Sequence, residues 1–292
     1  MMGRHRSGVL CAIAFCIVML NTAVAHAQEC LGRIVSLEEA AADYNPFSPV
    51  AHRSTFGVTI ENTGSAACRY RLVARDAAPG SDFGFQIASE GGGVLIASEG
   101  SIAPNADISS RELAPGETQR LELVYGLPEG QFLSPGEFRK DIELALKDAA
   151  VEEDGGAALD AASLPLICSV EDHLGVNIAG AGVATTVDFG ELAEGDSRRV
   201  VIEARANRSF LLEIESLNSG ALVMEPPYQD WRIEYDVDLN GRSLKLPFKA
   251  GPYERGGIGG QSFPLDFRIG NADDKRAGLY TDEITVTIRP AM

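Results

Sequence analysis

Two stretches of this 292-residue chain repeat one pattern of glycine, aromatic and apolar residues. Residues 136–146 read GEFRKDIELAL, and residues 278–288, which lie 142 positions later, read GLYTDEITVTI. In both copies an aromatic residue follows the glycine by two positions, and three apolar residues then occupy every second position. Such a period of two is typical of a strand with one buried face. The repeat therefore predicts two related β domains, each closing on the same kind of strand.

The remaining apolar segments also favour an all-β chain. They are short, turn residues separate them, and no window combines helical periodicity with helix caps. Many short strands with frequent turns predict two antiparallel β-sandwiches. Residues 37–42 (LEEAAA) could form one helical turn. The predicted strands are residues 56–60, 68–73, 93–97, 118–125, 138–146, 164–169, 174–178, 199–204, 210–216, 231–239, 243–248, 263–269 and 283–288.

Composition divides the chain into segments. The N-terminus combines two arginines, a short apolar run and the A-x-A sequence Ala25-His26-Ala27, which is typical of a cleaved secretory signal peptide. An acidic stretch in the middle of the chain is rich in Ala and Gly and has no apolar period, which is typical of a linker. The predicted division is a signal peptide at 1–27, an N-terminal domain at 28–150, a linker at 151–163 and a C-terminal domain at 164–292.

The charge of the mature chain excludes some partners. Loss of Arg4 and Arg6 with the signal peptide takes the formal charge from −17 to −19. Nucleic acid and anionic lipid both require basic surfaces, so neither is expected as a partner. The simplest interpretation of the acidic charge is the solubility of an exported protein.

Three cysteines remain after cleavage, and export places them in an oxidising compartment. Cys30 and Cys68 both fall in the N-terminal domain and are its natural pair, although the sequence leaves the other two pairings open. Cys168 follows an apolar run, which favours a buried thiol over a reactive one.

Residues that could carry chemistry have simpler structural explanations. Residues 236–241 (DVDLNG) match the opening of a calcium loop, but Pro247 occupies the position that requires a bidentate glutamate. Alternating apolar residues around them favour a hairpin with Asn240-Gly241 as its two-residue turn. His52 and His173 lack metal-ligand spacing. We therefore expect no metal site, no cofactor and no enzymatic activity, because no catalytic constellation emerges.

Apolar residues in predicted loops of the N-terminal domain are candidates for surface binding. Exposed apolar loop tips can bind other surfaces. The alternative is that these side chains fold back and close the ends of the sandwich. The candidates are Phe47, Phe83, Phe85, Leu127, Phe132 and Leu133.

Several motifs, in order along the chain, resemble the spore coat protein U family, the subunits of archaic chaperone–usher pili. The resemblance implies an immunoglobulin-like sandwich that lacks one strand and exposes a hydrophobic groove. In that family a periplasmic chaperone fills the groove first, and the N-terminal extension of a neighbouring subunit then replaces it by β-strand addition. The motifs are residues 44–48 (YNPFS), 187–192 (VDFGEL), 205–207 (RAN, before Phe210) and 277–282 (AGLYTD), with the Cys30 and Cys68 arrangement.

The chain departs from an ordinary subunit of that family in two ways. It has two domains, and only Gln28 and Glu29 precede Cys30 in the mature chain, which leaves no free segment to donate. The resemblance therefore implies a tip subunit whose incomplete C-terminal domain accepts a strand and whose N-terminal domain is an adhesin. The alternative is a self-complete secreted protein with two sandwiches that binds a small ligand or carbohydrate.

The resemblance also implies partners and a location. The expected partners are a periplasmic pilus chaperone, an outer-membrane usher and a neighbouring pilin subunit. The expected route is Sec-dependent export to the periplasm, followed by assembly into a fimbrium at the cell surface.

Overall fold

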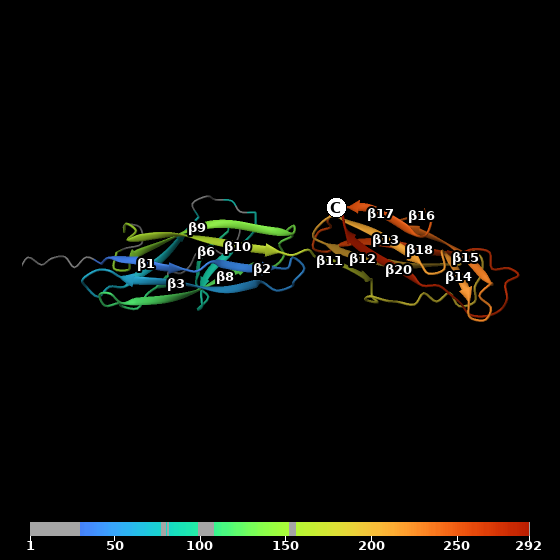
Figure 1. Cartoon of the computed structure of the whole chain (residues 1–292), viewed down its shortest axis with the longest axis horizontal. Coiled ribbons are helices and arrows are strands. Elements are labelled where there is room, and N and C mark those ends of the chain that lie inside the picture. The colour runs from blue at the N-terminus through green and yellow to red at the C-terminus, as the bar shows by residue number, and fades with distance from the viewer. Residues whose placement is uncertain (1–29, 77–79, 81, 99–107, 152–155, 292) are drawn as a thin grey trace, which may run out of the picture.

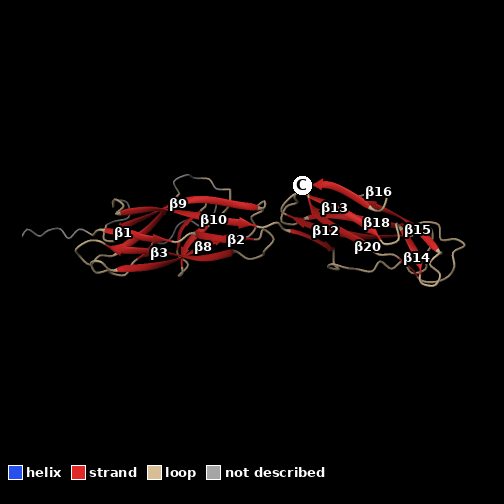
Figure 2. Ribbon diagram, in the orientation of Figure 1, coloured by secondary structure: helices blue, strands red, loops and turns tan. Residues whose placement is uncertain are grey.

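The computed structural model describes residues 30–76, 80, 82–98, 108–151 and 156–291, and the predicted signal peptide lies outside them. These residues form β-strands and no helix, arranged as two lobes that lie end to end (Figures 1 and 2). Each lobe contains two sheets packed face to face around an apolar core. The prediction of an all-β chain with two tandem sandwiches is confirmed. Within the described residues, no helix has the length and apolar character needed to cross a membrane.

The first lobe consists of two five-stranded sheets, with the orders β1-β3-β8-β5-β6 and β2-β10-β9-β4-β7. All strand pairs in it are antiparallel except β2 and β10, which run parallel. The strands are β1 (Gly32–Leu37), β2 (Ala40–Tyr44), β3 (His52–Asn62), β4 (Tyr70–Arg75), β5 (Gln86–Ser89), β6 (Val94–Ala97), β7 (Ile108–Ser109), β8 (Thr118–Leu127), β9 (Gly136–Asp148) and β10 (Asp160–Val170).

The second lobe is built on a larger and a smaller sheet. The larger has the order β11-β12-β18-β15-β14-β19, with β16 paired to β15, and the smaller has the order β17-β13-β20. The strands are β11 (Leu174–Ile178), β12 (Ser197–Ala206), β13 (Phe210–Ser216), β14 (Ala221–Met224), β15 (Arg232–Leu239), β16 (Arg242–Leu244), β17 (Phe248–Tyr253), β18 (Gln261–Ile269), β19 (Tyr280–Thr281) and β20 (Ile284–Pro290).

Strand β10 corrects the predicted domain boundary. It pairs with β9 along its whole length, and Leu164, Leu166 and Cys168 lie in the core of the first lobe. The predicted linker at 151–163 therefore leads from β9 into β10 within one sandwich, and the second lobe begins after β10 rather than at residue 164. Alternation predicted this strand correctly, but alternation does not say which sheet a strand joins.

Two further local predictions have opposite outcomes. The helical turn predicted at 37–42 is wrong, because β1 ends at Leu37 and β2 begins at Ala40, where the chain crosses between the two sheets. The hairpin predicted at Asn240-Gly241 is confirmed. Leu239 pairs with Arg242, and the two turn residues have φ values of 52° and 76°, the left-handed conformation that a two-residue turn requires.

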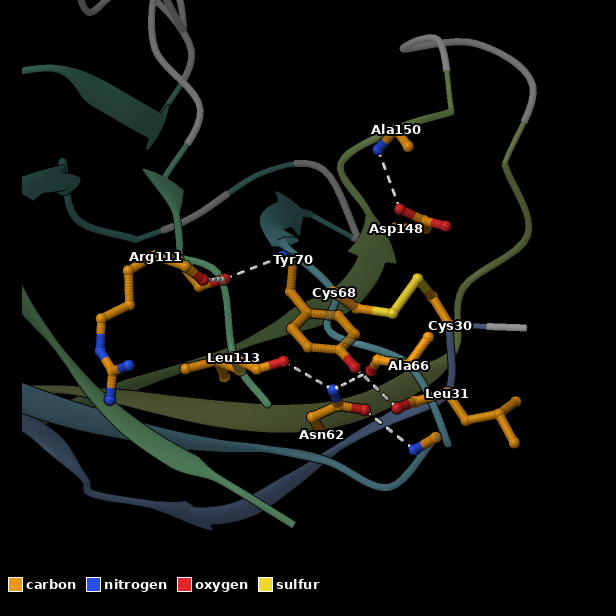
Figure 3. Close-up of a disulfide and its surroundings, with 12 residues drawn as sticks. Cys30, Leu31, Asn62, Ala66, Cys68, Tyr70, Arg111, Leu113, Asp148 and Ala150 are labelled. Atoms are coloured by element: carbon orange, nitrogen blue, oxygen red, sulfur yellow. Dashed lines mark hydrogen bonds between the residues drawn. A yellow bond between two sulfur atoms is a disulfide. The ribbon is translucent and has the colours of Figure 1, made fainter. Parts of the chain in front are cut away.

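A disulfide and a buried asparagine fasten the end of the first lobe that lies away from the second. The predicted Cys30–Cys68 bond is present, and it joins the start of the described chain to the segment before β4 (Figure 3). Asn62 is fully buried, and its Nδ2 donates hydrogen bonds to the carbonyl oxygens of Ala66 and Leu113 at 2.7 and 2.8 Å. Cys168 is free and buried, and its burial raises the pKa of the thiol to about 12.

Removal of this disulfide is expected to destabilise the first lobe. The bond closes a loop with a sequence separation of 38 residues, for which the chain-entropy estimate is a loss of about 4 kcal/mol. We expect the double variant Cys30→Ser/Cys68→Ser to unfold at a lower guanidinium concentration, as followed by far-UV circular dichroism. Reduced wild-type protein is the matched control and should behave like the variant. An unchanged midpoint would contradict the structural role of the bond.

Candidate functional site

An open groove runs along the second lobe between β20 and the segment of residues 183–192. Its cavity volume is about 860 Å³. One wall comes from β20, the opposite wall from residues 185–192, and the floor from the larger sheet. Apolar side chains dominate the walls and floor, and among them are Ile178, Val187, Phe189, Val200, Ile202, Leu222, Ile233, Leu265, Phe267, Ile269, Ile284 and Val286.

Strand β20 forms one lip of the groove and is an edge strand. Among the described residues it pairs with β13 alone, so the backbone groups on its other edge face the groove. Its inward-pointing side chains Ile284, Val286 and Ile288 pack against the core of the second lobe but are only partly buried. An edge strand over a partly open apolar core is a template for pairing with another strand.

The first copy of the sequence repeat shows how such a strand is covered. Leu72 of β4 pairs with Leu146 of β9, and Leu212 of β13 pairs in the same way with Ile288, the repeat counterpart of Leu146. The two closing strands therefore occupy equivalent positions in their lobes. Yet Ile142 is 0% exposed, whereas its counterpart Ile284 is partly exposed. The element that covers Ile142 in the first lobe therefore has no counterpart beside β20 among the described residues.

In the first lobe, strand β10 covers the corresponding edge. In the first lobe β10 lies between β9, to which it is antiparallel, and β2, to which it is parallel. Its alternate side chains Leu164, Leu166, Cys168 and Val170 fill the core between the sheets and are at most 5% exposed. In the second lobe, no strand of the described residues takes this position, and the groove is the space it would fill.

The backbone of the other lip pairs with no strand among the described residues. Within the described residues, the backbone N–H groups of residues 183–189 donate no hydrogen bond. Val187 and Phe189 line the groove, and both are partly buried. Arg198 covers the ring of Phe189 at 5.5 Å from its centroid and donates from Nε to the carbonyl of Asp188 at 3.3 Å. The lip is thus held in place while its edge stays unpaired, as β2 would be without β10.

A polar cluster at the base of β20 has a structural role. The Asp282 carboxylate accepts hydrogen bonds from the Tyr235 hydroxyl, from Ser216 Oγ at 2.6 Å and from the Asn218 backbone N–H at 2.9 Å. Burial raises the pKa of Tyr235 above its ordinary value. These bonds fix the bend where the chain passes from β19 to β20. No group of three or more His, Cys, Asp or Glu residues in the described part of the chain is arranged to hold a metal ion.

The six candidate surface-binding residues do not form an exposed surface. Phe83, Phe85 and Leu127 are at most 4% exposed and lie in the core of the first lobe, so the prediction that they contact a surface is corrected. Large apolar side chains next to a forming core are buried because burial removes their area from water.

The other three candidates lie at the end of the first lobe that faces the second. Leu133 packs partly buried against the first core. The Phe47 ring lies edge-on to the rings of Phe132 and His173, with centroid distances of 6.1 and 6.2 Å. Arg255 of the second lobe covers the Phe132 ring at 5.3 Å. Phe47 and Phe132 therefore join the two lobes.

Comparisons with known proteins return pilus tip proteins among the solved structures. No family model matches the chain, so the spore coat protein U resemblance stays a prediction, and no curated protein matches it. The chaperone–tip adhesion subunit complex CsuC–CsuE of archaic Csu pili from Acinetobacter baumannii aligns at 16% identity and a TM-score of 0.45, covering 86% of this chain and 97% of that one.

Two further adhesin structures align more weakly. The CFA/I adhesin CfaE of enterotoxigenic E. coli has 13% identity and a TM-score of 0.37, with coverage of 91% of this chain and 94% of that one. The tip adhesin CupB6 of Pseudomonas aeruginosa has 12% identity and a TM-score of 0.34, with coverage of 88% and 91%. Likeness at this level carries no argument about function, so the functional argument rests on the groove.

The sequence contains a partial signal for the groove. The motif at 187–192 marks one lip and the repeat at 278–288 marks the other. When β10 is assigned to the second domain, the sequence no longer reveals that the two lobes differ in how their repeat strands are covered. Its alternating residues Leu164, Leu166, Cys168 and Val170 follow the first repeat copy and lie in the core of the first lobe.

The two lobes are expected to differ in stability, and the repeat supplies a matched pair of variants. Ile142→Ala removes a fully buried side chain and should cost about 2–5 kcal/mol. Ile284→Ala at the partly exposed counterpart should cost less than half as much. Trp231, the single tryptophan, reports on the second lobe by fluorescence, and far-UV circular dichroism reports on both. Equal costs would indicate that β20 is already covered.

Proposed function

We propose that this chain is an exported, non-enzymatic subunit of a chaperone–usher pilus, and that its second lobe accepts a β-strand from another polypeptide. The observation that carries the proposal is the unequal cover of the two repeat strands. Strand β9 is paired on both edges, whereas β20 is paired on one edge within the described residues. The remaining edge of β20 and the unpaired lip at 183–189 face each other across an apolar groove.

A strand is the occupant that satisfies both sides of this groove. Its backbone pairs with β20 on one side and with the opposite lip on the other, as β10 does with β9 and β2. Its inward side chains fill the core, and each fully buried apolar side chain contributes about 1.5–3 kcal/mol. A small apolar ligand could fill the volume but would leave the backbone groups of both lips unpaired, which disfavours the alternative function of ligand binding.

Two strands would occupy the groove in succession, one from a chaperone and one from a neighbouring subunit. The open groove exposes apolar surface that invites aggregation, so a chaperone strand in the periplasm would protect it before assembly. A segment of a neighbouring subunit would then replace the chaperone at an outer-membrane usher. In this proposal the mature chain is first in the periplasm and then in a fimbrium at the cell surface.

The first lobe suits the outermost position in such a pilus. It already contains the strand that completes its sandwich, so it needs no strand from another chain. We therefore propose that it forms the adhesive tip. Its free end, stabilised by the Cys30–Cys68 bond, carries the exposed side chain of Leu31 (Figure 3). The loop residues Phe47 and Phe132, which pack at the opposite end, are not part of the proposed adhesive surface.

Self-completion of the second lobe tests the proposal without a known partner. A copy of residues 149–170, with the copy of Cys168 changed to Val, is appended after Met292, so that a second β10 can fold back along β20. We expect the unfolding transition reported by Trp231 fluorescence to move to higher guanidinium concentration, with a gain of at least about 3 kcal/mol from the apolar side chains it buries. The far-UV transition of the first lobe should stay in place.

A matched extension separates strand insertion from the effect of a longer chain. In the control, the copies of Leu164 and Leu166 are changed to Asp, because a charged side chain cannot enter the apolar groove without a large cost. The control should leave the Trp231 transition unchanged. If both extensions leave it unchanged, the second lobe is self-complete and the strand-acceptor proposal fails.

A further inference from the structure

The end of the second lobe that lies farthest from the first is formed by β14 and the loops beside it (Figure 1), and four apolar side chains in these segments are exposed. We call them the distal patch: Leu217, Tyr228, Trp231 and Leu279, which are 75%, 40%, 38% and 61% exposed. The segments of three of them are joined by backbone hydrogen bonds: Met224 donates to the Trp231 carbonyl at 3.0 Å, Glu225 donates to the Leu279 carbonyl at 3.1 Å, and Tyr228 donates to the Glu225 carbonyl at 3.1 Å. A clustered apolar surface at one end of a domain marks an interaction site.

The distal patch adjoins one end of the groove. Leu279 and Arg276 both line the groove, and the Arg276 guanidinium lies 3.6 Å from the ring centroid of Tyr228. The same loop between β18 and β19 therefore belongs to both features. A polypeptide that leaves the groove at this end meets the patch at once.

The first lobe indicates the direction of the inserted strand. Strand β10 runs antiparallel to β9, with Asp160 opposite Leu146 and Val170 opposite Gly136. In the second lobe the counterparts of Leu146 and Gly136 are Ile288 and Gly278. A strand inserted in the same way begins beside the end of β20 and leaves the groove beside Gly278. The next part of the donor chain therefore emerges at the distal patch.

The junction between the two lobes is an example of a sandwich attached directly after a strand in this position. Strand β10 leaves the first lobe, and after three residues the chain enters β11 of the next sandwich. That sandwich packs on the end of the first lobe, where Arg255 covers Phe132 and bonds to Ser134 Oγ. Phe132 and Ser134 lie in the loop before the first repeat copy, as Arg276 lies in the loop before the second. The distal patch therefore occupies the same position in the second lobe that Phe132 occupies in the first lobe.

We propose that the distal patch is the docking surface for the folded sandwich that comes after the donated strand in the neighbouring chain. The contact repeats the end-to-end packing between the two lobes of this chain. The inference rests on the proposed function, because it needs a strand in the groove. The expected partner surface is a loop at one end of a β-sandwich that carries apolar side chains or an arginine, since both pack on exposed aromatic rings.

Site-specific photocrosslinking in the cells that export this chain tests the docking surface. The crosslinking residue p-benzoylphenylalanine is placed at Val286 in the groove, at Trp231 or Leu279 in the distal patch, and at Val35 in β1 as an exposed control. We expect Val286 to capture an extended segment with alternating apolar residues. Trp231 and Leu279 should capture the folded part of that same chain, and Val35 should capture neither.

Binding measurements then separate the distal patch from the groove. The double variant Leu217→Ser/Trp231→Ser should bind a synthetic peptide of the captured segment with unchanged affinity, because neither side chain lines the groove. It should release the complete neighbouring subunit at least about tenfold faster than the wild type does.

Each other outcome contradicts one of the two proposals. If the Val286 probe captures a strand but the patch probes capture only a second copy of this chain, or nothing above the Val35 control, the docking proposal fails and the strand-acceptor groove stands. Equal release rates for the variant and the wild type would also contradict the docking proposal and leave the strand-acceptor groove standing. If Val286 captures no strand and no peptide binds, the proposed function fails, and the docking proposal fails with it.

Discussion

A strand over the core of a sandwich is most stable when both of its edges are hydrogen-bonded and its inner face is covered, and the contrast between the two lobes follows from this constraint. The chain contains the same closing strand twice, as β9 and β20. Strand β9 meets the constraint because β4 and β10 flank it. Strand β20 has β13 on one side and a groove on the other. Because the two strands share sequence pattern and register, the difference between their environments isolates the effect of the one missing neighbour.

Strand β10 has two roles that are linked through its direction. It completes the core of the first lobe through side chains such as Leu166 and Cys168, and it delivers the chain to the second lobe at the far end of the sandwich. The short connection at 171–173 is then held by Asn207, whose side chain is fully buried and bonds to the backbone of Glu171 and His173 at 2.9 Å. The same strand, β10, therefore completes the first sandwich and connects it to the second.

The sequence predicted patterns that depend on local spacing and missed those that depend on partners. Alternation predicted most strands, and the hairpin at Asn240-Gly241 follows from turn chemistry. The Cys30–Cys68 pair is confirmed, although the domain assignment that favoured it is wrong for Cys168, which lies in the same lobe. Sheet membership is a long-range property, so β10 was predicted as a strand and assigned to the wrong lobe. Short strands such as β7 and β14, which have 2 and 4 residues, contain too few alternating positions to be recognised from the sequence. The groove could be inferred only by comparing the surroundings of the two repeat copies.

The fate of the predicted surface residues follows from the same constraint. A sandwich closed on both sides still has two open ends, and large loop side chains cover them. Phe83 and Phe85 enter the core directly, whereas Phe47 and Phe132 need the second lobe to complete their burial. An apolar loop at a sandwich end therefore indicates either a core that closes on itself or a neighbour that closes it. At the junction the neighbour is the second lobe, and the docking surface proposed at the far end applies the same reasoning to the exposed Leu279 and Trp231.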